Sequence, residues 1–564
     1  MLFNSYSIKD ICRCDNKLNK NNDILKYAFV VLISILLLMI PCVNSYAPIE
    51  PEDSLLYVSH SSKVNEGELD IQFIYNITAN LSNIIFDIYD EEHGEIAKGR
   101  AFGTKGEHKA AEIIYENMTK IGLYTTIQKL DRPPGNHFND IITKLEVINY
   151  TAIINDEPID CFIAPSWNGP QGQQNELNTT FNHCNLKIIP IPKFPCLYNH
   201  KLAKETEDFI FITEDQWYSP NWSLPIISLF KPFLAPIKHL MMLHLTSLFN
   251  IKKQTEFWYK FYPHCKGLIL YDFNKDCHDM IYFGDSSKNS LPVLFINGSI
   301  GEKINEHPDL FRIDFFLKQR LNTSVISYNV IGQLNGTDPT KTVIVSSLYD
   351  SWWCQGTADS AIGMAIVLAI AKYFYEHNLT PKYTVKFIAF SGEEYNIRGA
   401  RYYEATHKDE DIIYMIDLNQ LGFTQEEPRL TLDIVSDKFL FLNEIWDIVE
   451  RTNYVNRTGN TADIKKVFWG SGIIPSNPYP FVTRRSSVKT VTFFKDGGWI
   501  LHHRDGLNHT EGDVLKYFNW KDVSVTGELI LNITKYLTLE PEENLIEYTT
   551  HLTDLKLLVN DKLN

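Results

Sequence analysis

The chain has 564 residues, of which 44% are hydrophobic and 22% are charged, and its formal net charge is −16. This composition is typical of globular domains and excludes a disordered, collagen-like or multi-span membrane protein. The negative charge also argues against nucleic acid as a partner, because nucleic-acid binding requires a positively charged surface.

An uncharged apolar run covers residues 27–43 near the N-terminus. Lys17, Lys20 and Lys26 precede it, as expected for a flank that stays in the cytoplasm. We interpret residues 1–45 as a cytoplasmic leader followed by either a cleaved signal peptide or a type II signal anchor. Both alternatives send the rest of the chain into the secretory pathway, as a luminal, extracellular or single-pass membrane protein.

Asparagine sequons agree with a secretory chain. Thirteen Asn-x-Ser/Thr triplets occur, whereas about five are expected from the composition. One of them, at Asn508, lies directly before a histidine. The other twelve are predicted glycosylation sites: Asn76, Asn80, Asn117, Asn149, Asn178, Asn221, Asn297, Asn322, Asn335, Asn378, Asn456 and Asn532.

Cysteines crowd the centre of the chain, and an oxidising compartment favours one or two disulfides among them. These five are Cys161, Cys184, Cys196, Cys265 and Cys277. Cys354 stands apart. It either pairs with one of the five or is a buried free thiol.

The first half of the chain predicts a helix, a strand and then a β-rich region. Residues 107–118 have apolar side chains at helical spacing, and Gly122 is a predicted C-cap before an alternating strand at 124–130. The apolar stretch 224–249 predicts a helical hairpin on the surface or over the site, with a second membrane contact as the alternative. The short β-like runs of this region are 209–213, 267–271 and 292–296.

After about residue 328, strand-like and helical runs alternate. This pattern predicts an α/β fold with a mostly parallel mixed sheet between two layers of helices. Ligands bind such sheets at the carboxyl ends of the strands. The predicted strands are 342–347, 384–390, 412–418 and 489–494, and the predicted helices are 361–375, 440–452 and 525–536.

Acidic side chains follow two of these strands. Asp359 comes after a glycine-rich turn and before an apolar helix, and the adjacent Glu393 and Glu394 follow the strand 384–390. Since adjacent side chains point in different directions, one glutamate can bind a cation while the other transfers protons. Carboxylates and imidazoles bind Zn²⁺, and a catalytic zinc keeps a position open for water. Histidines that could complete such a site come late in the chain: His502, His503 and His509.

Each of these elements also has a purely structural interpretation. Asp359 alone could cap the helix that follows it, and a Glu-Glu pair after a strand is usually a solvated turn. The combination favours a metal site, because Gly-x-x-Asp-Ser, Gly-Glu-Glu and His-x-x-x-Asp follow one another in this order.

In this order the motifs resemble those of the co-catalytic zinc aminopeptidases, whose relatives include glutamate carboxypeptidase and the transferrin receptor. The resemblance covers about 85–147 and 328–540, and it implies the zinc exopeptidase fold. Many members insert a protease-associated (PA) domain between these stretches, and residues 291–298 resemble its closing strand. The expected segments are the leader 1–45, the first part of the peptidase-like domain 46–147, a β-rich PA-like insert 148–327, the main peptidase-like domain 328–540 and a tail 541–564.

The resemblance also implies a role for each matched residue. Asp359, Glu394 and His509 would be metal ligands, with His503 and His502 as competitors for the last position. Glu393 would be the general base. The other residues expected to line the pocket are Asp350, Trp352, Trp353 and Tyr479.

Two positions depart from the family pattern. Leu348 stands where the family has its first histidine ligand, and Asn419 stands where it has a later aspartate ligand. Asp350, which orients that first histidine in the family, would have lost its partner. Both departures affect the same one of the two family ions, so the resemblance implies a single Zn²⁺ held by the remaining ligands.

Three functions remain open from the sequence. The first is single-zinc hydrolysis of peptides by an exopeptidase of the secretory pathway, of either the aminopeptidase or the carboxypeptidase type. The second is a catalytically inactive receptor or scaffold on the same fold. The third is a glutaminyl-peptide cyclotransferase, since glutaminyl cyclases resemble the one-zinc arrangement. The expected partner is a peptide substrate or a protein ligand, with a homodimer also open.

Overall fold

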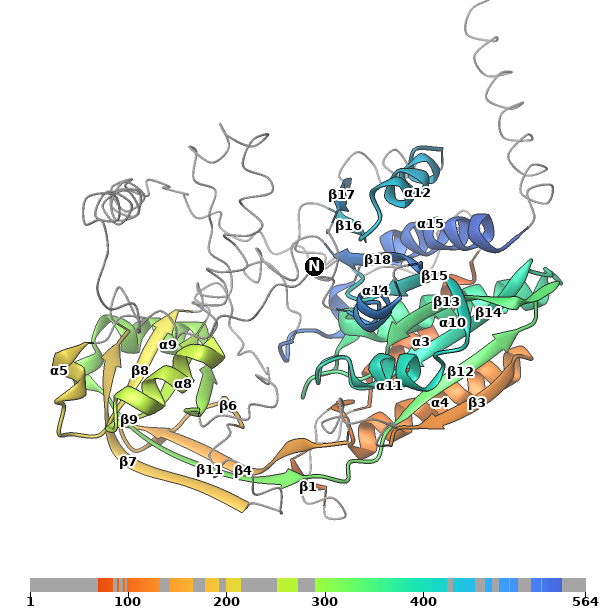
Figure 1. The fold of residues 1–564 in the computed structure, drawn as a ribbon. Helices are drawn as coiled ribbons and strands as arrows, with labels where there is room; N and C mark the ends of the chain where they lie inside the picture. Colours follow the sequence, from red (N-terminus) through yellow and green to blue (C-terminus); the bar gives the residue numbers. More distant parts are fainter. Residues whose placement is uncertain are drawn as a thin grey trace, which may run out of the picture. The chain divides into compact units, whose positions relative to one another are not determined.

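The structure is a computed structural model of the whole chain, shown in Figure 1. The leader, the apolar stretch 224–249, Asn508, the competitors His502 and His503, and the tail lie outside the described residues. The described residues are 69–84, 89–90, 95–96, 99–131, 142–165, 178–191, 199–214, 251–271, 290–422, 430–451, 462–468, 476–485, 487–495, 509–518 and 520–539.

A mixed eight-stranded sheet forms the centre of the main domain, with the strand order β17-β16-β18-β15-β13-β14-β12-β3. β13 runs parallel to β14 and β15, β15 runs parallel to β18, and β12 and β3 continue the sheet antiparallel. The predicted α/β fold with a mostly parallel mixed sheet is confirmed. The strands are β3 (Tyr124–Lys129), β12 (Tyr328–Leu334), β13 (Asp338–Leu348), β14 (Tyr383–Phe390), β15 (Asp411–Leu418), β16 (Leu430–Ser436), β17 (Ala462–Phe468) and β18 (Lys489–Lys495).

Helices cover both faces of this sheet (Figure 1). Because side chains alternate along a strand, Val345 of β13 packs into the larger core while its neighbour Ile344 packs into the smaller one. The larger core includes α3 (Ile71–Ser82), α4 (Lys105–Ile121), α10 (Ile362–Glu376), α12 (Phe439–Arg451) and α15 (Trp520–Thr538). The smaller core includes α11 (Arg398–Thr406) and α14 (Tyr479–Arg484).

Local sequence sets the ends of α4. Thr104 caps its N-terminus, because its side chain accepts a hydrogen bond from the Glu107 amide. Gly122 ends it with a φ of 101°, a left-handed conformation that glycine adopts without strain. The predicted C-cap at Gly122 is therefore confirmed.

The apolar helix α10 is the central helix of the larger core. Among the described residues, Thr357–Glu376 is the one helical stretch long and apolar enough to cross a membrane, and 94% of its most apolar window is buried within the protein. Burial on all sides explains why it carries so few polar side chains. Its composition is therefore that of a core helix.

A second eight-stranded sheet is formed by strands between Lys144 and Asn322, in the order β5-β4-β11-β7-β8-β9-β10-β6. It confirms the β-rich character predicted for the middle of the chain, while its assignment as a PA domain and the predicted domain boundaries stay predictions. The strands are β4 (Lys144–Ile154), β5 (Glu157–Pro158), β6 (Cys161–Ala164), β7 (Asn178–Pro190), β8 (Phe209–Glu214), β9 (Cys265–Tyr271), β10 (Val293–Ile296) and β11 (Arg312–Asn322). The helices of this region are α5 (His200–Ala203), α8 (Ile251–Phe261) and α9 (Gly298–Glu306), and a short pair β1 (Tyr89–Asp90) and β2 (Glu95–Ile96) precedes it.

The described cysteines are free thiols, so the predicted disulfides are not formed among them. Cys161, Cys265 and Cys354 are buried and Cys184 is exposed. Cys161 packs into the core on one face of the second sheet, whereas Cys265 packs into the core on the other. The sheet itself thus separates these two sulfur atoms. Cys196 and Cys277 lie outside the described residues.

The described sequons lie on helices, strands and turns, and their glycosylation stays a prediction. Asn76 and Asn80 are on α3, where Asn80 is exposed. Asn322 has a partner on the neighbouring strand β4, because its side-chain amide donates a hydrogen bond to Glu146 Oε1 at 2.6 Å. Asn221 and Asn456 lie outside the described residues.

Candidate metal centre

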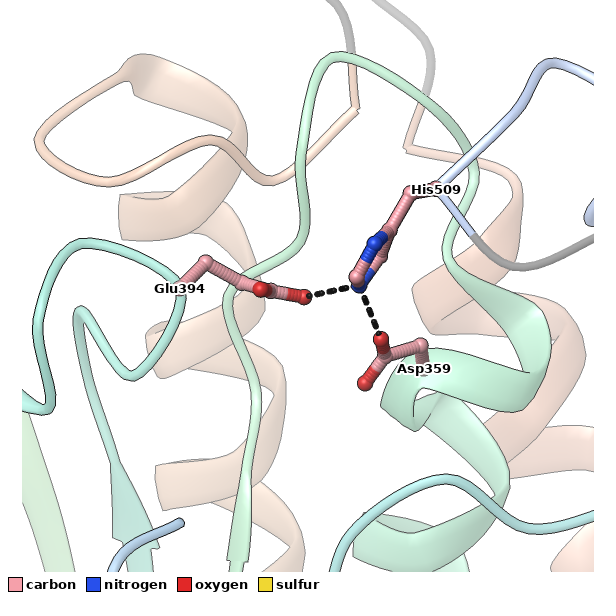
Figure 2. Close-up of side chains that lie close together, drawn as sticks. All are labelled: Asp359, Glu394 and His509. Carbon is pink, nitrogen blue, oxygen red and sulfur yellow. Dashed lines mark hydrogen bonds and ion pairs between the residues drawn. The ribbon is translucent and has the colours of Figure 1, made fainter. Parts of the chain in front are cut away.

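Two neighbouring parallel strands carry the acidic residues of the candidate centre. β13 and β14 are in register up to the pair Leu348 and Phe390, so the loops that follow them leave from the same edge of the sheet. The first loop leads to Asp359 at the start of α10, and the second loop carries Glu394. His509 lies in a turn that precedes α15, and the three side chains converge on one point (Figure 2).

The geometry of these three side chains suits a small cation. One ligand atom from each of Asp359, Glu394 and His509 lies within 4.8 Å of the others. His509 Nε2 is 2.7 Å from Asp359 Oδ2 and 3.3 Å from Glu394 Oε1. The His509 side chain is 13% exposed and that of Glu394 is 8% exposed, so the group is enclosed but accessible. Carboxylate oxygens and an imidazole nitrogen are a donor set that Zn²⁺ accepts.

The electrostatics of the group also fit a cation. Burial, followed by the charge of Asp359, raises the pKa of Glu394 to about 7. Burial alone would lower the pKa of His509, but the negative charges of Glu394 and Asp359 hold this pKa well above its usual value. Asp359 Oδ1 is buried and makes no hydrogen bond within the described part of the chain. A divalent ion would satisfy this oxygen and offset the repulsion between the carboxylates.

Asp359 is not the cap of α10 that its position suggested. The residue at the N-cap of α10 is Ala361, and its side chain accepts no hydrogen bond from an amide of the helix. Instead, the Asp513 carboxylate accepts hydrogen bonds from the Ala358 and Asp359 amides at 2.8 and 3.3 Å. Gln420 Nε2 donates to Asp359 Oδ2 at 3.0 Å. These contacts orient the carboxylate of Asp359 toward the centre and leave Oδ1 free.

Asp350 has partners that the sequence did not reveal. Its carboxylate accepts hydrogen bonds from the amides of Glu393 and Glu394 at 3.1 and 3.3 Å. Leu348 offers no imidazole for Asp350 to orient, and Asp350 instead holds the backbone of the glutamate loop. Burial, followed by the charge of Glu107, raises the pKa of Asp350 well above its usual range.

The side chain of Glu393 points toward Asn419. Its Oε1 accepts a hydrogen bond from Asn419 Nδ2 at 3.0 Å, and the same amide nitrogen donates to Ser476 Oγ at 2.9 Å. Burial, followed by the charge of Glu394, raises the pKa of Glu393 well above its usual value. A carboxylate with a raised pKa accepts a proton more readily, which is the property required of a general base.

Around Asn419, a hydrogen-bond network connects Glu393, Ser476 and Asp417. Ser476 Oγ donates to Asp417 Oδ2 at 2.6 Å. Ser346 Oγ and Asn477 Nδ2 donate to Asp417 Oδ1 at 2.7 and 3.1 Å. Burial raises the pKa of Asp417 to about 6. Leu348, at the end of β13, is fully buried and offers no ligand atom in its side chain.

Two of the four residues expected to line a pocket lie beside the candidate ligands. The ring of Trp352 meets that of His509 edge to face, with 5.9 Å between centroids, and the Asp350 carboxylate reaches the glutamate loop. Trp353 is buried, stacks with Trp352 and packs at a tilt against Phe162 of β6. Tyr479 packs instead against the smaller core, so the segment around it reaches the site through Ser476.

Sequence reasoning missed the polar residues that support the centre: Arg100, Glu107, Asp417, Gln420, Ser476 and Asn477. Gln420 directly follows Asn419, so a search for polar side chains after β15 would have found it. Ser476 and Asn477 lie between segments that are outside the described residues, and no local pattern marks them. Arg100 belongs to the short motif Gly-Arg-Ala-Phe-Gly-Thr, and Glu107 lies three residues after it. The roles of both residues depend on partners more than 200 positions later in the chain.

Comparisons with known proteins agree with this architecture. Residues 329–534 match the peptidase family M28. A protein of Phaeosphaeria nodorum named "Probable zinc metalloprotease" is 29% identical over 149 residues, which cover 26% of this chain and 27% of that protein. A protein of the same name from Pyrenophora teres f. teres is 31% identical over 114 residues, which cover 18% of this chain and 24% of that protein. The matched part is therefore about a quarter of the length of these relatives.

A solved structure shows a similar fold. The zinc aminopeptidase BSAP of Bacillus subtilis superposes with a TM-score of 0.55 at 17% sequence identity, covering 85% of this chain and 97% of that chain. At this identity the likeness concerns the fold alone. Residues 329–534 thus match the peptidase family M28, and the fold of the chain is similar to that of this zinc aminopeptidase.

Proposed function

We propose that the chain is an exopeptidase of the secretory pathway that hydrolyses peptides with one Zn²⁺ held by Asp359, Glu394 and His509. The observation that carries the proposal is the convergence of their ligand atoms within 4.8 Å, with Glu393 directly beside them. Three protein ligands and one open position form a legitimate catalytic zinc site.

The bound metal would polarise the scissile carbonyl group and lower the pKa of a water molecule. Glu393 is the residue that takes the proton from this water and passes it to the leaving amine. Asn419 orients Glu393 by donating a hydrogen bond to Oε1. Asp350 keeps the backbone of Glu393 and Glu394 in place, so that adjacent side chains serve two different purposes.

The metal content of the full-length protein tests this proposal. We expect one zinc per chain and hydrolysis of peptides whose recognised end is unblocked. A chelator should abolish the activity, and added zinc should restore it. Peptides blocked at either the amino or the carboxyl end would identify the end that is recognised. A protein that holds no zinc after incubation with excess zinc contradicts the proposal.

A non-catalytic receptor or scaffold is the second candidate. Buried Leu348 and hydrogen-bonded Asn419 favour it, because neither residue offers a carboxylate or an imidazole to a metal ion. A folded protein without zinc and without hydrolysis would support this candidate. A glutaminyl-peptide cyclotransferase, the third candidate, would release ammonia from N-terminal glutamine in the same assay series.

A further inference from the structure

We propose that Arg100 and Glu107 are positioning residues, which hold the two loops that carry the proposed zinc ligands and the general base. Both belong to the segment 99–107, which we call the anchoring segment. Both side chains are fully buried. Each reaches a different loop, and the two loops meet at the candidate centre. The chemical consequence rests on the proposed function, whereas the loop contacts do not.

Arg100 holds the loop that follows β13. Its guanidinium donates to the backbone oxygens of Tyr349, Gln355 and Gly356 at 2.8, 2.5 and 2.8 Å. A further bond at 3.0 Å reaches Leu81 O at the end of α3. The planar fork of arginine reaches both ends of this loop at once, which the single ammonium group of lysine cannot do. Arg100 therefore sets the path of the chain into Gly356 and Asp359.

The backbone of the anchoring segment adds to this contact. The amide of Arg100 donates to Ser351 Oγ at 3.0 Å, and the Ser351 amide donates to Arg100 O at 3.1 Å. Gly99 has a φ of +60°, and a Cβ at this position would lie 1.9 Å from Cys354 O. Close approach of the two backbones thus requires glycine at position 99.

Glu107 holds the loop that follows β14. Its Oε1 accepts hydrogen bonds from Ser327 Oγ at 2.7 Å and from Ser391 Oγ at 2.5 Å. Its Oε2 accepts from the Gly103 amide at 2.7 Å, which ties the carboxylate to its own segment. Ser391 begins the loop that carries Glu393 and Glu394, so Glu107 fixes the origin of that loop.

Arg100 and Glu107 contact different loops, so replacing each residue should affect a different part of the chain. Loss of Arg100 contacts should loosen residues 349–359, while loss of Glu107 contacts should loosen residues 391–397. A residue that only stabilised the whole fold would loosen both loops together with the rest of the sheet. Residues that orient metal ligands typically change metal affinity by about 10- to 100-fold when they are replaced.

Hydrogen–deuterium exchange of the full-length protein tests the inference, with the variants Arg100→Lys and Glu107→Gln. In chelator, we expect exchange at least about tenfold faster at 349–359 in Arg100→Lys and a smaller acceleration at 391–397 in Glu107→Gln. With zinc, we expect Arg100→Lys to bind zinc about tenfold more weakly and to lower kcat more than it changes KM. If Arg100→Lys does not fold, Ser351→Ala is a milder alternative, because it removes the hydrogen bond between the Arg100 amide and Ser351 Oγ and keeps the Arg100 guanidinium.

Glu410→Gln is the matched control. Glu410 is a partly buried carboxylate that accepts hydrogen bonds from Thr342 Oγ1 and the Tyr403 hydroxyl, both at 2.8 Å, and pairs with Lys386. It lies at the opposite end of the strands from the centre. We expect it to lower the melting temperature and leave zinc affinity and the exchange of both loops unchanged.

Two outcomes would overturn the inference. One is wild-type exchange in both loops of folded Arg100 and Glu107 variants. The other is that the Arg100 and Glu107 variants accelerate exchange equally in all peptides, with the same pattern as Glu410→Gln. If the wild-type protein binds no zinc and cleaves no peptide while each loop still loosens selectively, the positioning role is supported and the proposed function fails.

Discussion

The two halves of the candidate centre differ in how their buried polar groups are paired. In the half formed by Asp359, Glu394 and His509, a buried carboxylate oxygen lacks a hydrogen-bond donor and acidic groups face one another. In the half formed by Leu348 and Asn419, the side chains are an alkyl group and an amide, and Asn419 has two hydrogen-bonded partners.

This difference shows which features of the protein alone indicate a metal site. Buried polar atoms are normally hydrogen-bonded, so an unpaired oxygen beside like charges marks a place where a cation would lower the free energy. Around Asn419, the carboxylates of Glu393 and Asp417 accept hydrogen bonds from neighbouring side chains, so a cation has less to offer there. The following predictions test whether the two halves differ in this way.

The largest expected effect is that of His509→Ala on the first half. Removal of the imidazole leaves two carboxylates as ligands, so we expect zinc binding to fall by at least about a hundredfold and hydrolysis to reach background. Zinc should raise the melting temperature of the wild type but not of this variant. His377→Ala, in which the lost ring stacks on Tyr373 at the end of α10, serves as the control and should bind zinc normally.

Glu393→Gln should have the next largest effect. The amide cannot accept the proton of the attacking water, so we expect kcat to fall by about 10²- to 10⁴-fold while zinc still binds at one per chain. Metal analysis and steady-state kinetics on the same sample measure both quantities. Hydrolysis at the wild-type rate would show that Glu393 is not the base.

Asn419→Asp probes the second half. The new carboxylate loses two donated hydrogen bonds and faces Glu393, so we expect the free energy of unfolding to fall by about 1–3 kcal/mol in chelator. Zinc stoichiometry should stay at one, because Leu348 supplies no ligand. The double variant Leu348→His with Asn419→Asp should approach two zinc ions per chain. Binding of two ions by the single variant would contradict our assignment of the lost positions.

The smallest expected effect concerns pH and Asp417. Burial raises its pKa to about 6, so the folded state holds a proton that the unfolded state has already lost between about pH 4 and 6. The contribution of Asp417 to stability is therefore largest at low pH and declines as the pH rises through this window. Asp417→Asn should cost more stability at pH 4 than at pH 7, as measured by urea unfolding in chelator. A cost that grows with pH would contradict the raised pKa.

Much of the fold could be predicted because it depends on local patterns. The ends of α4 follow from Thr104 and Gly122, and the strands of the main sheet follow from short apolar runs between polar turns. The glutamates and Asp359 could be found because they come directly after strands, where α/β sheets place their ligands. These signals lie within a few residues of one another in the chain.

The network behind Glu393 could not be predicted in the same way. Asn419 was identified as a lost ligand, but its bond to Glu393 and its continuation through Ser476 to Asp417 join segments separated by 26 to 59 positions. Asp350 was expected to lack its histidine partner, but its contacts with two amides of the glutamate loop were not predicted. Hydrogen bonds between distant segments follow from chain packing, which no local pattern encodes.

The sequence by itself determined which chemistry is available: adjacent glutamates, an aspartate before an apolar helix and a late histidine. Only the tertiary structure decided which atoms meet, and it brought His509 within 2.7 Å of an aspartate 150 residues earlier. The physical reason is that side-chain identity is a local property, whereas the orientation of a ligand depends on contacts from every segment packed around it.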